Sequence, residues 1–117
     1  METAKIYSRN KLSQMMDQNE EEVNELMKIF VSMVPAMLQE MQDAAKGEEW
    51  SRCSDLAHKL KSSMRLWAID SLDEDVLYIE TNGLNAENTE QVDQKIQNLS
   101  RQLLEVIEDM KKELAIS

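Results

Sequence analysis

The side chain best suited to chemistry is that of His58, the only histidine among the 117 residues. On a helix that turns about 100° per residue, the large apolar side chains near it fall within an arc of roughly 80° on the side opposite His58. The imidazole is therefore predicted to face water. Near pH 7 a neutral imidazole supplies a nucleophilic nitrogen. The apolar arc consists of Cys53, Leu56, Leu60, Met64 and Trp67.

The predicted face around His58 is basic and carries mostly short side chains. Lys61 and Arg65 follow His58 on the same face within two turns, so their charges could lie beside a phosphoryl group on the ring. Ser54 and Ser62 have little bulk, which would let the surface of another protein approach the nitrogen. This pattern indicates an exposed surface that can bind an anion. The residues predicted to contact a partner are Ser54, Asp55, Lys59, Ser62 and Arg65.

Other chemistries lack the residues they need. A zinc or iron site would require further histidine or cysteine ligands, and the single cysteine, Cys53, is predicted to be a small buried hydrophobe. A Ser-His-Asp hydrolase needs an oxyanion hole, which a solvent-facing helix does not offer because its N–H groups are already used. No glycine-rich phosphate loop is present. We therefore expect no metal or cofactor, and any phosphoryl group would have to come from another protein.

Composition restricts the class of protein further. The formal net charge is −10, which disfavours nucleic acid and anionic membranes as partners. The most apolar stretch is too short to span a bilayer, and the first residues lack a secretory signal. A cytoplasmic protein is expected. With 42% hydrophobic residues but only two glycines and one proline, the chain is predicted to form one mostly helical domain over residues 1–117.

A long helix is predicted in the first half of the chain. Asp17 and Glu20 have the spacing of a capping box, so the helix is expected to begin there and to end at Gly47. Pro35 lies inside it and predicts a kink or a local break, which we interpret as one bent helix. The apolar positions of this helix step by three and four residues. They are Val23, Met27, Phe30, Val34, Met37 or Leu38, Met41 and Ala45.

Four other helices are predicted, over about residues 8–16, 48–67 and 71–83 and from Asn88 or Thr89 onward. Ser71 and Glu74 have the spacing of a second capping box. In the first helix, the side chains expected to face inward are Leu12, Met15 and Met16. The last helix has the most regular apolar repeat, made of Val92, Ile96, Leu99, Leu103, Val106, Met110 and Leu114.

These patterns predict an all-α fold. Four substantial amphipathic helices with short connections bury their apolar faces most simply as an antiparallel bundle. The prediction is an up-down-up-down four-helix bundle with a short extra N-terminal helix.

The residues around His58 resemble the signature of histidine-containing phosphotransfer (HPt) domains of two-component phosphorelays. That signature is a histidine, any residue, leucine or isoleucine, lysine, glycine and two small residues, followed later by a glycine and a leucine. The chain has Ser62 and Ala68 where the family usually has these two glycines. The likeness covers about residues 12–83. It is carried by Ala57-His58-Lys59-Leu60-Lys61-Ser62-Ser63, by Leu66-Trp67-Ala68-Ile69-Asp70-Ser71-Leu72, and upstream by residues 30–38 and 44–50.

The resemblance implies that His58 accepts a phosphoryl group from the aspartate of one receiver domain and passes it to another. It further implies that Lys61 steadies the phosphoryl group. The implied partners are a response-regulator receiver domain and a hybrid sensor histidine kinase, with Mg²⁺ supplied only by the receiver. On this interpretation the chain is a phosphotransfer intermediate with a covalent phosphohistidine, rather than a stand-alone catalyst, and it is expected to be a monomer.

Two alternatives remain open at this stage. The chain could be a helical interaction module that docks on a partner without ever carrying phosphate, which the departure at Ser62 and the surplus of acidic residues favour. It could also be a purely structural bundle that forms oligomers through a further apolar stripe, which would require a large exposed apolar patch.

Overall fold

The computed structural model describes residues 7–115, apart from the side chain of Lys11. This part of the chain contains five α-helices and no strand. They are α1 (Asn10–Met15), α2 (Glu20–Lys46), α3 (Trp50–Leu66), α4 (Asp73–Leu84) and α5 (Thr89–Leu114).

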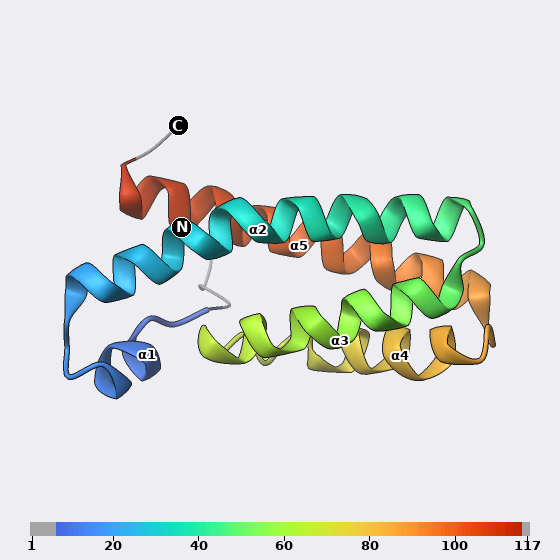
Figure 1. The fold of residues 1–117 in the computed structure, drawn as a ribbon, viewed down its shortest axis with the longest axis horizontal. Coiled ribbons are helices and arrows are strands. Elements are labelled where there is room, and N and C mark those ends of the chain that lie inside the picture. The colour runs from blue at the N-terminus through green and yellow to red at the C-terminus, as the bar shows by residue number, and fades with distance from the viewer. Residues whose placement is uncertain (1–6, 116–117) are drawn as a thin grey trace, which may run out of the picture.

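The four longer helices form an antiparallel bundle of two layers. Helices α2 and α5 lie side by side in one layer and α3 and α4 in the other, with successive helices running in opposite directions (Figure 1). Contacts join α2 to α3, α3 to α4, α4 to α5 and α5 to α2, which closes the ring around one core. The all-α prediction of an up-down-up-down bundle with a short extra N-terminal helix is confirmed.

The short helix α1 compensates for unequal helix lengths. Helices α2 and α5 have 27 and 26 residues, whereas α3 and α4 have only 17 and 12, so one end of the long layer extends past the short one. Helix α1 lies beneath this overhang (Figure 1). Tyr7 and Leu12 are buried there, and the backbone N–H of Ser8 donates to the carbonyl of Trp67 over 2.8 Å. The N-terminal segment therefore covers the core at this end of the bundle and keeps it from solvent.

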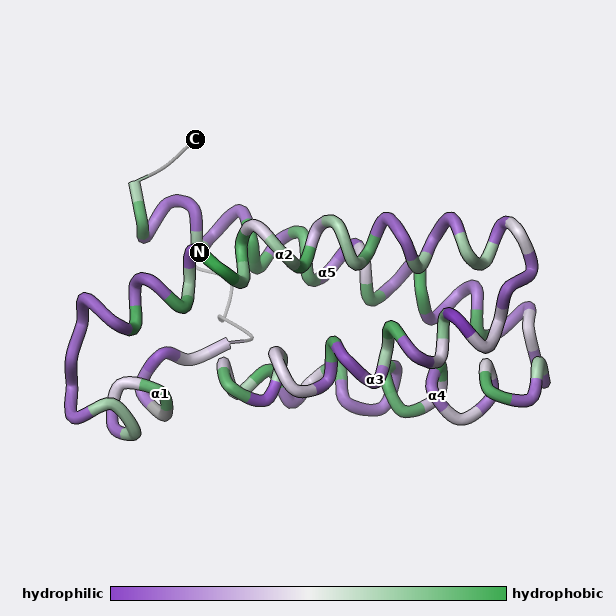
Figure 2. The backbone as a smooth tube through the Cα atoms, viewed as in Figure 1, coloured by the Kyte–Doolittle hydropathy of each residue, from purple (hydrophilic) through white to green (hydrophobic). Residues whose placement is uncertain are grey.

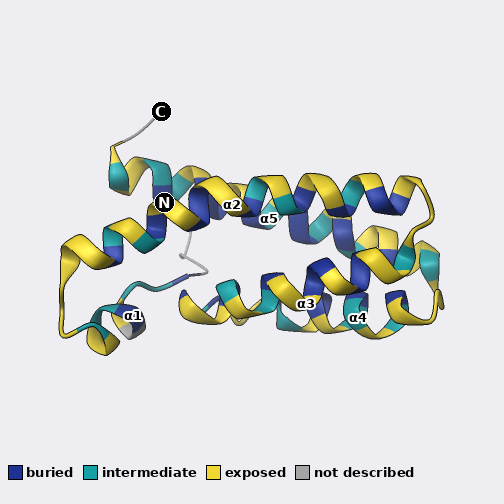
Figure 3. Cartoon of the chain, viewed as in Figure 1, coloured by how far each residue is buried: buried dark blue, intermediate teal, exposed yellow. Residues whose placement is uncertain are grey.

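The core follows the apolar stripes expected from the sequence. Hydrophobic and buried residues line the inner sides of the helices, whereas hydrophilic and exposed residues lie outside (Figures 2 and 3). Of the two candidates in α2, Leu38 is buried and Met37 only partly so. In α1, Leu12 is buried, but the prediction that Met15 faces inward is wrong because it is 65% exposed. The α5 repeat is buried from Val92 to Met110, and Leu114 is partly buried against the core.

Both predicted capping boxes are wrong. Asp17 adopts a left-handed conformation with φ of 51°, and Asn19 instead caps α2 by accepting the N–H of Glu22. Ser71 lies before the start of α4, whose N-cap, Leu72, makes no side-chain cap. Acidic side chains in the first turn of α4 interact favourably with the helix dipole in place of a cap. The interpretation of α2 as one helix holds, since it continues from Glu20 to Lys46 through Pro35.

Helix α3 ends in a turn that requires a left-handed residue. Ala68 has φ of 54°, its N–H donates to the carbonyl of Arg65, and the N–H of Ile69 donates to that of Met64. This is the pattern of a Schellman motif, in which glycine usually occupies the left-handed position. Ala68 is also one of the two places where the chain departs from the HPt pattern.

Replacing Ala68 by glycine is expected to stabilise the protein by about 1 kcal/mol. The left-handed conformation costs a residue with a Cβ atom roughly 1–2 kcal/mol, while glycine loses some of this gain through its freer unfolded chain. Urea unfolding of Ala68→Gly and the parent chain measures the difference. An equal or lower free energy of unfolding for the variant would contradict this reading of the turn.

Candidate functional site

The imidazole of His58 lies on the outer side of α3, and its side chain is 68% exposed. The prediction that it faces solvent is confirmed. The apolar arc on the opposite side of the same helix is buried, which fixes the rotation of α3 and hence the outward direction of His58. The buried residues of this arc are Cys53, Leu56, Leu60, Met64 and Trp67.

A carboxylate on the neighbouring helix holds the ring. Oε2 of Glu80, on α4, lies 2.6 Å from Nδ1 of His58. An ionised carboxylate can only accept hydrogen bonds, so Nδ1 carries the hydrogen in this pair when the ring is neutral. The Nε2 atom then has a free lone pair. A neutral, oriented ring with an unprotonated outer nitrogen is the form in which imidazole acts as a nucleophile.

The same carboxylate pairs with Lys61. Its Nζ donates to Oε1 of Glu80 over 2.9 Å, and the lysine side chain is 17% exposed. Glu80 thus bridges His58 and Lys61 with one oxygen each. Lys61 therefore lies beside the ring, as predicted, whereas Glu80, which is 22 residues from His58 in sequence, was not predicted.

These contacts keep Glu80 ionised. The hydrogen bond from Lys61 lowers the pKa of the Glu80 carboxyl below its usual range, burial opposes this, and the hydrogen bond with His58 lowers the pKa further. A depressed pKa contributes stability above the unfolded value of about 4.3, and this contribution is lost as the pH falls through the lower folded value. At neutral pH the bridge is therefore fully formed.

One residue predicted to contact a partner is buried between α3 and α4. The prediction that Ser54 is exposed is wrong: it is 4% exposed, and its hydroxyl donates to the backbone oxygen of Glu80 over 2.6 Å. Ser54 is on the same side of α3 as His58, but α4 covers it. The other four residues of that set are exposed, and their contact with a partner stays a prediction. They are Asp55, Lys59, Ser62 and Arg65.

An apolar patch lies on the other side of α3, where it meets α2. Ile29 and Met33 of α2 are 53% and 42% exposed. They share a helix face with Glu40, which pairs with Arg52 of α3 over 2.7 Å. Leu66, 39% exposed, lies fourteen residues after Arg52 and so on the same face of α3 as Arg52. We call Ile29, Met33 and Leu66 the α2–α3 patch. The sequence analysis did not single out these residues.

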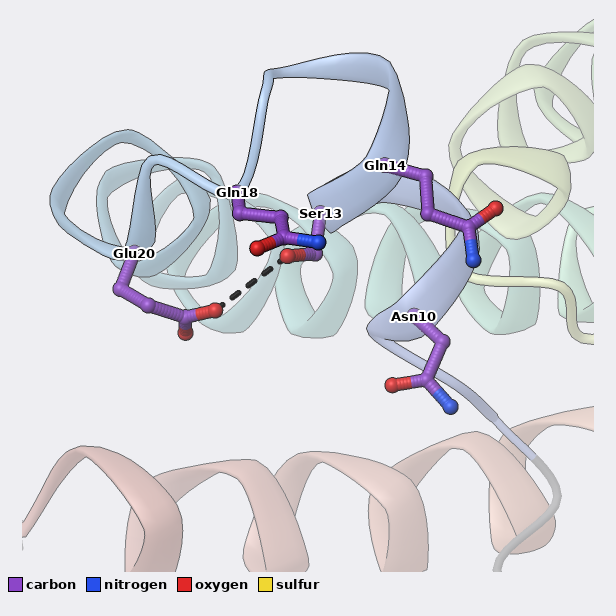
Figure 4. A pocket seen from close by; sticks show the side chains of 5 residues that line it. All are labelled: Asn10, Ser13, Gln14, Gln18 and Glu20. Carbon is purple, nitrogen blue, oxygen red and sulfur yellow. Dashed lines mark hydrogen bonds between the residues drawn. The ribbon is translucent and has the colours of Figure 1, made fainter.

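No other part of the described chain competes with His58. Burial raises the pKa of the Cys53 thiol to about 11, so this thiol is unreactive, as its predicted burial implies. A polar pocket between α1 and the start of α2 is lined by five side chains (Figure 4), but its one charged group, Glu20, already pairs with Arg9 over 2.6 Å. Its other lining residues are Asn10, Ser13, Gln14 and Gln18.

Residues 7–115 contain neither a cluster suited to a metal ion nor a helix suited to a membrane. No group of three or more histidine, cysteine, aspartate or glutamate side chains is arranged to hold a metal ion. None of the helices has the length and apolar character needed to cross a bilayer.

The family model of the Hpt domain matches residues 25–114, which is most of the chain. The protein therefore belongs to the Hpt domain family. No curated protein and no solved structure matches the chain. Hpt domains act in phosphorelays as carriers of phosphoryl groups on histidine and interact with receiver domains and histidine kinases.

Proposed function

We propose that His58 accepts a phosphoryl group from the aspartyl phosphate of a receiver domain and passes it to a second receiver. The observation that carries this proposal is the exposed ring with Nδ1 held by Glu80 at 2.6 Å. The Nε2 lone pair attacks the phosphorus, the bond from phosphorus to the aspartyl oxygen breaks, and the aspartate leaves as a carboxylate. The ring becomes positively charged, and the Glu80 carboxylate stabilises that charge. The return step reverses these bond changes.

Basic groups on the same face support this chemistry. An ammonium group has three donors, and Glu80 accepts one of those of Lys61, so the others can bind oxygens of a phosphoryl group on the ring. Lys59 and Arg65 are exposed and lie in the one basic part of a chain of net charge −10. They attract a partner whose phosphorylated pocket is acidic. That pocket would also supply the Mg²⁺.

The direct test is transfer from a phosphorylated receiver domain. The chain is expected to gain radiolabel that is lost in acid and retained in alkali, because phosphohistidine is labile to acid whereas phosphoserine is stable to it. A chain that binds the receiver but gains no label would be a docking module, the alternative class of function. Acid-stable label would place the phosphate on a serine such as Ser51 or Ser62, and either result would overturn the proposal.

Replacing Glu80 by glutamine is expected to slow transfer by about tenfold to a hundredfold, since a hydrogen bond to a charged group contributes roughly 1.5–3 kcal/mol and 1.4 kcal/mol corresponds to a factor of ten. The amide can still bond to Nδ1, but it no longer offsets the positive charge on the phosphorylated ring. Single-turnover kinetics with saturating receiver measure the rate. Glu74→Gln is the matched control, because Glu74 is an exposed glutamate on the same helix. Equal rates for the two variants would remove Glu80 from the mechanism.

We also propose that the α2–α3 patch contacts the receiver. A stable protein interface covers about 800 Å² on each partner, so a receiver centred on His58 extends well beyond the ring. Burying exposed apolar side chains against a partner is favourable, since it removes their surface from water. The rings of Phe30 of α2 and Trp67 at the end of α3 lie 6.3 Å apart, so the neighbouring residues Ile29 and Leu66 belong to parts of the two helices that pack against each other.

The variant Ile29→Ser/Met33→Ser is expected to weaken receiver binding at least tenfold, while the rate at saturating receiver changes little. Titration calorimetry and transfer kinetics measure the two quantities. Leu104→Ser is the control, because Leu104 is 43% exposed but belongs to α5, which does not border α3 in the ring of helices. Equal loss of affinity in control and variant would show that the patch has no specific role.

A further inference from the structure

The buried hydroxyl of Ser54 joins α3 to the residue that orients His58. It donates to the backbone oxygen of Glu80 over 2.6 Å, while the carboxylate of Glu80 bonds His58 over 2.6 Å. Ser54 and His58 are one helical turn apart on α3. We propose that Ser54 is a positioning residue for the phosphoacceptor, which it influences through the backbone of Glu80. This proposal rests on the proposed role of His58.

Helix α3 thus holds Glu80 at both ends. The backbone oxygen is bound by Ser54, and the two carboxylate oxygens are bound by His58 and Lys61. A glutamate side chain has three rotatable bonds. Contacts at the carboxylate alone would therefore leave the backbone of Glu80 free to shift along the axis of α3. The bond from Ser54 fixes the backbone from which the side chain starts. The position of the carboxylate then depends on both contacts.

The close approach of the two helices makes this bond possible. Gly83 lies against the first turn of α3, where a Cβ atom on it would be 2.8 Å from the carbonyl oxygen of Trp50 and 3.4 Å from Cβ of Ser54. No larger residue fits at this separation without a shift of the backbone. A serine hydroxyl is short, and it reaches a carbonyl of α4 only because the helices lie this close. Ser54, Gly83 and the Glu80 carbonyl thus lie together where α3 and α4 make contact.

A carbonyl oxygen has two lone pairs, so the bond from Ser54 adds to the helical hydrogen bond of α4 without replacing it. A second buried serine, Ser100 of α5, is 3% exposed, and its hydroxyl has no hydrogen-bond partner among the described residues. The two serines have the same side chain and the same burial, and they differ in whether the hydroxyl is bonded to the site. They form a matched pair for the test.

The test compares Ser54→Ala with Ser100→Ala. Two properties of His58 are measured in each: the proportion of the Nδ1–H tautomer of the neutral ring, from ¹⁵N NMR at alkaline pH, and the rate of phosphorylation by phosphoramidate, a small donor that needs no docking. Ser54→Ala is expected to lower the Nδ1–H proportion and to slow phosphorylation about threefold to tenfold, the range that corresponds to one net hydrogen bond. Ser100→Ala is expected to change neither.

A second comparison separates positioning from folding. In a Glu80→Gln background, adding Ser54→Ala is expected to change the phosphorylation rate much less than it does in the parent chain, because both substitutions act through the same carboxylate. A Ser54→Ala chain that melts earlier but keeps the parent tautomer proportion would overturn the proposal. So would an equal slowing in both backgrounds.

Failure of the proposed function can be told apart from failure of the proposed role of Ser54. If the parent chain accepts no phosphoryl group, His58 is not a phosphoacceptor, yet the tautomer measurement still reports whether Ser54 positions the ring. An unchanged tautomer in a chain that does accept phosphate would reject only the role of Ser54.

Discussion

His58→Gln is expected to take up no label from a phosphorylated receiver, whereas the parent chain is labelled. Glutamine is polar and favours helices, but its amide has no nucleophilic nitrogen, since that lone pair is delocalised into the carbonyl. Because the His58 side chain is 68% exposed and loses only its bond to Glu80, the substitution should change the free energy of unfolding by no more than about 1 kcal/mol. The measurement is gel autoradiography after transfer, with circular dichroism and urea unfolding as checks on the fold.

Lys112→Gln is the matched control for this experiment. Lys112 is exposed on α5, which does not border α3 in the ring of helices, so its variant should still be labelled. Retention of acid-labile label in His58→Gln would reject the assignment of the phosphoacceptor, since the chain has no other histidine.

Gly83→Ala is expected to destabilise the bundle by about 1–3 kcal/mol, the usual cost of overpacking. A methyl group on Gly83 would lie 2.8 Å from the carbonyl oxygen of Trp50, and that atom is backbone, so the helices themselves must separate. The higher helix propensity of alanine offsets at most about 1 kcal/mol of this cost. Separation also carries Glu80 away from His58, so phosphoramidate labelling should slow in the folded variant.

Gly47→Ala provides the control for Gly83→Ala. Gly47 has φ of −84°, which alanine adopts readily, and the nearest atom to an added Cβ would be the flexible carboxylate of Glu49, at 3.3 Å. The backbone oxygens of Asp43 and Ala44 would lie at ordinary contact distances of 3.6 and 3.8 Å. Its free energy of unfolding should stay within about 0.5 kcal/mol of the parent chain. Urea unfolding of both variants measures the contrast. A Gly83→Ala chain as stable as the parent would show that the helices can shift without cost.

Helix positions and the core of this protein follow from sequence because each long helix has one apolar stripe, and burying four such stripes leaves few arrangements. The outward direction of His58 follows from the same stripes, since Leu60 and Met64 on its helix must face the core. Helix ends were harder to predict. Asp17 and Asn19 are both good capping residues, and only the path of the turn decides which one caps α2.

The contact of His58 with Glu80 was not predicted, because a helical projection describes one helix without its neighbour. It placed Ser54 on the face of His58 correctly but could not show that α4 covers this part of the face. A signal for Glu80 does exist. In an antiparallel pair that turns near Ile69, residues 58 and 80 are equally far from the turn, so they lie at the same level. Taking the register from the turn would have placed Glu80 beside the ring.

The connection between α3 and α4 sets the level of Glu80 relative to His58. It is therefore constrained in length as well as in composition. Trp67, Ile69 and Leu72 of this connection are buried, so it cannot freely absorb an inserted residue, and the strain would be relieved by a rotation of α4 about its axis. Such a rotation would turn Glu80 away from the imidazole and replace Gly83 at the crossing by a residue with a side chain. Insertions and deletions between residues 67 and 72 should therefore be rare among functional descendants of this chain, even where single substitutions in the loop are common.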